Sequence, residues 1–198
     1  MFMVSASVII GCFLGFIFKN HIFFDVNLII KFGLYFLLFV IGLDIGRNKS
    51  IFKNLKNMNK KIILLPIITI IASLLGGAVA SFFIKMPIGE SIAISSGMGW
   101  YSFSAIELSK ISAELGSLSF LSNMFRELLA LLFIPFVSKK ITPLAAVSMS
   151  GAPAMDSVLP IINKHNTSDI SIISFYSGLV ISILVPLLVP TVVNIFIK

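Results

Sequence analysis

The sequence has few charged residues and almost no cysteine or histidine. Of its 198 residues, 12% are charged and 58% are hydrophobic, whereas a soluble domain carries about 25% charged residues. So little polar surface cannot coat a water-soluble globule of this size. This excludes a soluble enzyme, a nucleic-acid-binding protein and a disordered chain. The single cysteine, Cys12, excludes a disulfide framework and a cluster of metal ligands. We therefore predict an integral membrane protein and expect neither a cofactor nor a metal.

Long apolar runs are what the sequence has in abundance. A helix needs about 20 residues to cross about 30 Å of hydrocarbon. By this measure five runs are predicted to be full spans, namely residues 1–18, 27–45, 62–84, 117–137 and 170–197. Two further apolar segments, residues 91–104 and 142–163, are interrupted by glycine or proline and by polar residues. Such segments are typical of broken or re-entrant helices that line a site. The predicted fold class is an all-α polytopic membrane protein. It has about five full transmembrane helices plus two broken or re-entrant segments, and we expect all of them to form one transporter domain over residues 1–198.

The positive charges indicate the orientation of the chain. Six of the fifteen basic residues lie between Arg47 and Lys61, where there is no acid. Basic loops lie on the cytoplasmic side of a membrane, so we expect two spans in residues 1–46, a cytoplasmic loop over 47–61 and a core over 62–198. Lys139-Lys140 also reaches the cytoplasm if the first interrupted segment re-enters. If that segment crosses fully, the pair lies outside. We favour re-entry or a broken crossing, in a multi-pass membrane protein.

Acidic residues inside a bilayer are costly, so each one within a predicted span is a candidate for function. Glu127 lies near the middle of its span, and Asn123, four residues earlier, shares its helical face. Arg126 points about 100° away from Glu127, and we interpret it as a structural or accessory charge that pairs with a carbonyl or carboxylate elsewhere. Asp44, three residues before Arg47, is an accessory charge or one half of an interfacial ion pair.

The second interrupted segment carries another acid, Asp156, shortly after Gly151 and Pro153. A broken helix presents unpaired N–H and C=O groups, and a carboxylate beside it can bind an ammonium group or exchange a proton. Alternatively, Asp156 caps the half-helix that follows. Together, Glu127 and Asp156 give the predicted site a net negative charge, which favours a small cationic solute.

The first interrupted segment supplies the remaining candidates. Gly97 and Gly99 allow the backbone to unwind and approach a ligand closely. Trp100 and Tyr101 are expected to wall a pocket or stack on an ammonium group, or else to be interfacial aromatic residues. Ser102 and the serines around it predict a polar lining.

These stretches resemble the LysO-type lysine exporter family of bacterial inner membranes. Four pieces match and appear in family order. They are Ile41-Gly42-Leu43 before the basic loop, Gly97-Met98-Gly99-Trp100-Tyr101-Ser102, Arg126-Glu127-Leu128 followed by Ile134-Pro135, and Gly151-Ala152 with Asp156 and Leu159-Pro160. The resemblance implies efflux of L-lysine or a close basic analogue, driven by proton antiport, with Glu127 and Asp156 at the acidic positions. Pro153 departs from the small polar residue that the resemblance leads us to expect.

The resemblance also bears on assembly. Longer members of the family carry an additional N-terminal hydrophobic region, and this chain begins where their second part begins. We expect Met1 to be the natural start. The resemblance then implies a homo-oligomer, or a small companion membrane protein that supplies the remaining helices. Transporters that place their site between two structural repeats make such an association physically reasonable.

Three other functions are considered. A monovalent cation/proton antiporter or channel would use the same acids and broken helices. A non-catalytic subunit of a transporter assembly would tolerate neutral substitution of the charged residues. An intramembrane hydrolase would need Ser150 or Ser102 beside a histidine base, but His21 and His165 both fall in predicted loops away from mid-membrane, and no Ser–His–Asp arrangement is evident.

Overall fold

The computed structural model describes residues 60–197 and four helical phenylalanines of the first two predicted spans, Phe13, Phe32, Phe36 and Phe39. The chain divides into two compact units, residues 1–48 and 49–198. The boundary between the units falls within the predicted basic loop. The first two predicted spans, apart from the four phenylalanines, the segment 47–59 and Asp44 lie outside the described residues.

Three long helices have the length and composition needed to cross a membrane: α5 (Leu65–Ile84), α8 (Ala113–Lys140) and α11 (Ser168–Phe196). They correspond to the predicted spans 62–84, 117–137 and 170–197, with ends that differ by a few residues. A short helix, α4 (Lys60–Ile63), precedes α5. All regular structure in residues 60–197 is helical, which confirms the predicted all-α class.

Both interrupted segments are broken helices, as predicted. The first consists of α6 (Ile88–Ser95) and α7 (Tyr101–Ser109), which are separated by a turn. The second consists of α9 (Pro143–Ser150), the 3-10 helix η1 (Ala152–Met155) and α10 (Leu159–His165). We call α6–α7 the first hairpin and α9–η1–α10 the second hairpin. The breaks coincide with the glycine and proline residues, because these residues interrupt helical backbone hydrogen bonding or adopt non-helical dihedral angles.

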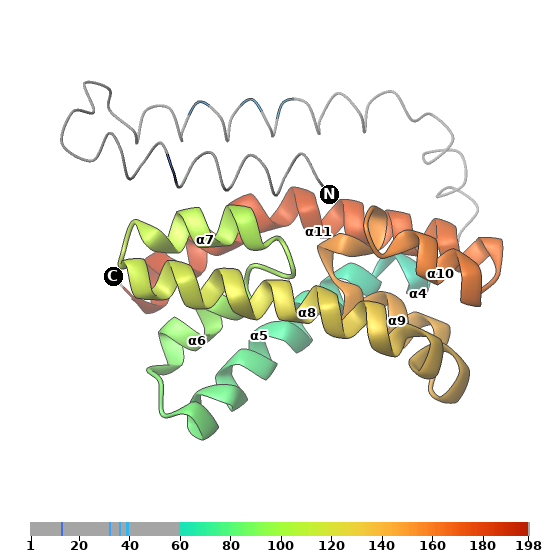
Figure 1. Cartoon of the computed structure of the whole chain (residues 1–198), viewed down its shortest axis with the longest axis horizontal. Coiled ribbons are helices and arrows are strands. Elements are labelled where there is room, and N and C mark those ends of the chain that lie inside the picture. The colour runs from blue at the N-terminus through green and yellow to red at the C-terminus, as the bar shows by residue number, and fades with distance from the viewer. Residues whose placement is uncertain (1–12, 14–31, 33–35, 37–38, 40–59, 198) are drawn as a thin grey trace. The chain divides into compact units, whose positions relative to one another are not determined.

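Each hairpin returns to the end of the bundle from which it entered. Helices α5 and α11 start at the same end, since the Tyr176 hydroxyl near the start of α11 donates to Ile63 O just before α5 (3.2 Å). Helix α8 runs in the opposite direction, because Ile134 near its end packs against Ile162 of α10 in a buried cluster. The first hairpin therefore enters at the end marked by Lys85, and the second enters at the end marked by Lys140 (Figure 1). Both segments are re-entrant, which agrees with the interpretation favoured for the first.

Close helix packing depends on small residues. The Ser91 hydroxyl of α6 donates to Gly77 O of α5 (2.7 Å), and a Cβ added at Gly77 would lie 2.2 Å from Ser95 Oγ. Gly116 of α8 is equally close to Ser109 of α7. Lipid supplies no hydrophobic drive between membrane helices, so their association relies on such close contacts and hydroxyl hydrogen bonds.

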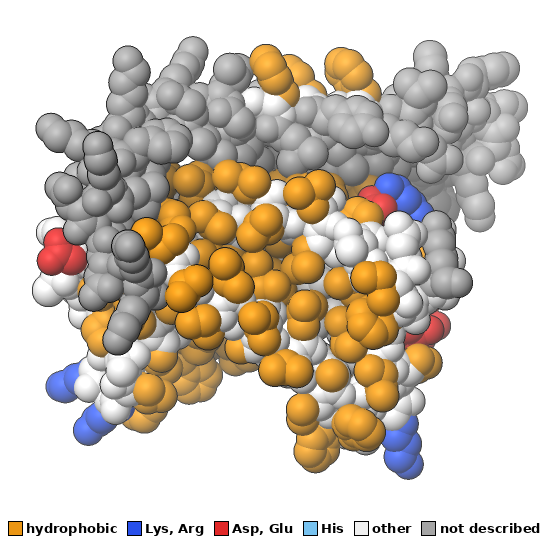
Figure 2. Space-filling model, turned by 180° about the vertical axis from the view of Figure 1, so that it is seen from behind, with side chains coloured by type: hydrophobic (Ala, Val, Ile, Leu, Met, Phe, Trp, Pro, Cys, Tyr) orange, Lys and Arg blue, Asp and Glu red, His pale blue; other side chains and the backbone are white. Residues whose placement is uncertain are grey.

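The outer surface is apolar in the middle and charged at its two ends. Figure 2 shows hydrophobic side chains over the middle of one face, with the charged side chains toward its sides. Large exposed hydrophobic residues on the three long helices include Ile71, Leu75, Phe82, Phe125, Leu132, Phe136, Ile183 and Leu187. A continuous apolar band with charged margins matches the hydrocarbon core of a bilayer.

Candidate functional site

The tip of the first hairpin is held by Asn123 in the middle of α8. The amide oxygen of Asn123 accepts a hydrogen bond from Gly99 N (2.8 Å), and its nitrogen donates to Ile94 O (3.0 Å). A Cβ added at Gly97 would lie 2.6 Å from Asn123 Nδ2. The predicted close approach at Gly97 is therefore made to this amide and to Ser104 within the bundle. Asn123 satisfies backbone groups that the helix break frees, as membrane depth requires.

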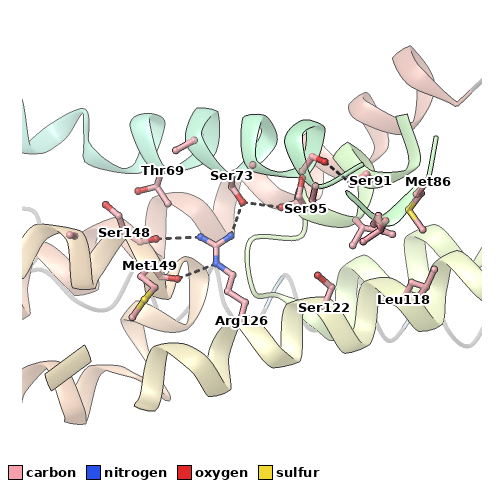
Figure 3. Close-up of a pocket in the computed structure, with 17 residues that line it drawn as sticks. Thr69, Ser73, Met86, Ser91, Ser95, Leu118, Ser122, Arg126, Ser148 and Met149 are labelled. Atoms are coloured by element: carbon pink, nitrogen blue, oxygen red, sulfur yellow. Dashed lines mark hydrogen bonds between the residues drawn. The ribbon is translucent and has the colours of Figure 1, made fainter. Parts of the chain in front are cut away.

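The second hairpin is held by Arg126, one turn further along α8. The guanidinium donates to Met149 O (3.2 Å) and Ser148 O (3.3 Å) in the last turn of α9, and to Ser73 Oγ of α5 (2.7 Å; Figure 3). The Ser73 hydroxyl in turn donates to Ser95 O at the end of α6 (3.3 Å). A cation at the C-terminal carbonyls of α9 also complements the helix dipole.

The two tips touch each other beside these side chains. Ala152 N of the second tip donates to Met98 O of the first (2.9 Å). Gly151 has φ +68°, and a Cβ added there would lie 2.3 Å from Met98 O; Gly99 has φ +89° and approaches Pro153 in the same way. The predicted glycines thus allow close contact between the hairpins. Pro153, the departure noted from the family pattern, forms part of this contact.

The acidic candidates lie on another side of α8. Tyr101, the first residue of α7, lies within Coulombic range of both Glu127 and Asp156. Glu127 is half-buried and has no hydrogen-bond or ion-pair partner among residues 60–197, whereas the exposed Asp156 carboxylate accepts from Ser157 N and Oγ. No side chain caps the start of α10, so Asp156 does not have the alternative capping role. Glu127 and Asp156 therefore both lie within electrostatic reach of Tyr101, although none of the three side chains hydrogen-bonds to another among residues 60–197.

The other predicted residues have more local surroundings. The Trp100 ring packs against Phe103, and the Tyr101 ring meets Phe120 edge-on, each with ring centroids 5.3 Å apart. Ser102 is exposed on α7. Within residues 60–197 the acids, histidines and cysteines form no group of three that could hold a metal ion.

A cavity of about 720 Å³ lies on the Arg126 side of α8, between α5, α6, α8 and α9 (Figure 3). Of the predicted site residues only Arg126 lines it. Ser95, one of the serines predicted to form a polar lining, also lies on its wall, whereas sequence reasoning missed the other hydroxyl residues there, which are Thr69, Ser73, Ser91, Ser122 and Ser148. Isolated hydroxyl residues within apolar spans could have predicted this wall, since such residues tend to face other helices.

Two re-entrant hairpins whose tips meet between long apolar helices, beside buried polar and charged side chains, are features of secondary transporters. Comparison with known protein families identifies the transporter family to which the chain belongs. The family model described as "Lysine exporter LysO" matches residues 5–193. The chain belongs to this family, which confirms the resemblance in its motifs. The family is one of transporters and not of enzymes, so the hydrolase alternative is set aside.

Two relatives illustrate the match. The chain is 35% identical over 184 residues to a putative lysine exporter of Haemophilus influenzae, covering 92% of this chain and 93% of that protein. It is 30% identical over 160 residues to lysine exporter LysO of Escherichia coli K12, covering 80% of this chain. The matched region is 53% of the Escherichia coli protein, about half of its length. No solved structure gives a significant match.

Proposed function

We propose that this protein exports L-lysine, or a close basic analogue, across the bacterial cytoplasmic membrane by exchange for protons. The observation that carries the proposal is that Glu127 and Asp156 both lie within electrostatic reach of Tyr101, which follows the first hairpin tip, in a member of the lysine exporter family. The names of the two relatives point to the same substrate.

The chemistry of the acidic group supports this substrate. Lysine carries two ammonium groups and a net positive charge, and two carboxylates within reach of one another attract such a cation. The same carboxylates can bind protons once the ammonium group has left, so substrate and proton compete for one site. That competition is the basis of antiport. Asp156 is exposed in the second hairpin and Glu127 is half-buried on α8, so in this proposal a movement of the hairpins changes their access to water.

The proposed orientation follows from the charges at the two ends of the bundle. The Lys140 end carries the basic residues Lys60, Lys61, Lys139, Lys140 and Lys164, whereas the Lys85 end carries Lys85 and Lys110 with Glu90, Glu107 and Glu114. Because short cytoplasmic segments are rich in lysine and arginine, we place the Lys140 end in the cytoplasm.

Radiolabelled L-lysine counterflow in proteoliposomes, with and without a pH gradient, tests this function. We expect lysine exchange that a pH gradient accelerates, and we expect Glu127→Gln and Asp156→Asn each to abolish it. Glu114→Gln, which neutralises an exposed acid in the first turn of the same helix α8, is the control and should transport normally. Normal counterflow in both site variants would contradict the proposed site.

The same vesicles distinguish the other functions. Flux of sodium or potassium that lysine does not compete with would indicate a cation/proton antiporter or channel. Full activity of the neutral variants in the presence of a complete transport partner would indicate a non-catalytic subunit. A homo-oligomer or a small companion membrane protein remains our prediction for assembly, and light scattering of the purified protein in detergent measures it directly.

A further inference from the structure

Arg126 is the sole charged side chain among the described residues that line the cavity between α5 and α8. Its oxygen acceptors, namely two backbone carbonyls and the Ser73 hydroxyl, are all neutral. Within residues 60–197, Arg126 forms no salt bridge; the ion pair found there joins Lys110 to Glu107. A cation away from water that is not paired with an anion is costly, so this cavity is electrostatically suited to an anionic group.

The guanidinium also has hydrogen-bonding capacity that the protein does not use. An arginine has five N–H donors. Here three donate to oxygen and a fourth points at Met98 Sδ, 3.9 Å from Nη1. One donor is thus left without an acceptor among the described residues.

Two hydroxyl groups on the cavity wall are similarly unused. Ser122 lies one turn before Arg126 on α8 and points from the helix into the cavity (Figure 3). The hydroxyls of Ser122, which is exposed, and Ser148, which is half-buried, have no hydrogen-bond partner among residues 60–197 and are free to meet a ligand. An arginine donor with nearby hydroxyl donors in a low-dielectric cavity matches the needs of a carboxylate, which accepts several charge-assisted hydrogen bonds.

We propose that this cavity is a subsite for the α-carboxylate of the exported amino acid, with Arg126 and Ser122 as its donors. The proposal rests on the proposed function and adds a specificity determinant to it. Glu127 and Asp156 by themselves would favour a diamine over an amino acid, because they repel a carboxylate. A separate cationic subsite on a neighbouring face of α8 makes the transporter select amino acids over the corresponding diamines.

The test compares L-lysine with cadaverine, which is lysine without its carboxylate. Binding and counterflow of radiolabelled L-lysine are measured with the full-length protein, and each unlabelled compound is used as competitor. We expect cadaverine to compete about tenfold or more weakly than lysine, the effect of losing a hydrogen bond to a charged group. In Ser122→Ala and Arg126→Gln this difference should shrink, because lysine binding weakens and cadaverine binding does not.

Arg126 also holds α9, so Arg126→Gln can fail to fold, and Ser122→Ala then carries the test. Ser117→Ala is its matched control, since Ser117 lies on α8, is exposed and, within the described part of the chain, bonds only to Ala113 O; it should keep the full difference. Equal competition by cadaverine in the wild type, or an unchanged difference in Ser122→Ala, would overturn the subsite.

Lysine export without discrimination between lysine and cadaverine would leave the proposed function intact. Carboxylate-dependent binding without export would refute the function but support the subsite, and absence of lysine binding would refute both.

Discussion

At the scale of residues, one turn of α8 decides how the two hairpins are held. Asn123 bonds to the first tip and Arg126 to the second. The sequence predicted correctly that Arg126 and Glu127 would not pair, because adjacent helical residues point about 100° apart; the structure pairs neither with the other. The sequence did not indicate that Arg126 bonds to Ser73, which is 53 positions away.

Two serines of α11 allow the cost of an unmet hydrogen bond at the second tip to be measured. The Ser174 hydroxyl donates to Ala154 O of η1 (2.7 Å), whereas the buried Ser177 hydroxyl, one turn later, has no partner among the described residues. Ser174→Ala should destabilise the protein by about 1 kcal/mol, since it leaves a buried carbonyl unsatisfied. Ser177→Ala should change stability little. Reversible unfolding in mixed detergent micelles measures both, and equal destabilisation would contradict the assignment.

At the scale of elements, the hairpins form because the bundle replaces the backbone hydrogen bonds that each break removes. The glycine and proline clusters predicted where the helices stop. They did not predict that the tips would meet through Met98 O and Ala152 N, because that contact joins segments more than fifty residues apart. The sequence likewise left open whether the segments cross or re-enter; the packing of α7 and α10 against α8 decides it.

The packing of α5 on α6 yields a prediction with a control at the adjacent residue. A Cβ at Gly77 would lie 2.2 Å from Ser95 Oγ and 2.9 Å from Ser91 O, whereas a Cβ at Gly76 meets nothing within 4 Å. Gly77→Ala should therefore destabilise the protein by about 1–3 kcal/mol through overpacking. Gly76→Ala should be neutral or slightly stabilising, because alanine has the higher helix propensity. Thermal unfolding of the two purified variants distinguishes them; equal melting temperatures would argue against this contact.

At the scale of the whole molecule, charge and topology agree. With both hairpins re-entrant, α5, α8 and α11 bring Lys139-Lys140 to the same end as the start of α5. That end also carries Lys60 and Lys61, the last residues of the predicted basic loop. A full crossing by the first interrupted segment would have separated the two sets of lysines, against the distribution that short loops normally follow.

Cysteine labelling in intact cells tests this topology. In a background with Cys12→Ser, we expect Glu90→Cys, in the first turn of α6, and Lys110→Cys, directly after α7, both to react with a membrane-impermeant maleimide from outside. Lys140→Cys should react only after the membrane is permeabilised. Labelling of the Glu90 and Lys110 positions from opposite sides would mean that the segment crosses the membrane.

The sequence by itself determined the membrane environment, the three spans among the described residues and the two helix breaks. These properties depend on composition and local backbone preference, which a linear pattern records. Only the tertiary structure decided that the hairpins re-enter from opposite ends, that their tips touch, and that Arg126 faces a hydroxyl-lined cavity while Glu127 and Asp156 lie within electrostatic reach of Tyr101. Those relations join segments that are distant in the sequence. They depend on which faces of the helices pack together, because that packing must satisfy the polar groups that cannot face lipid.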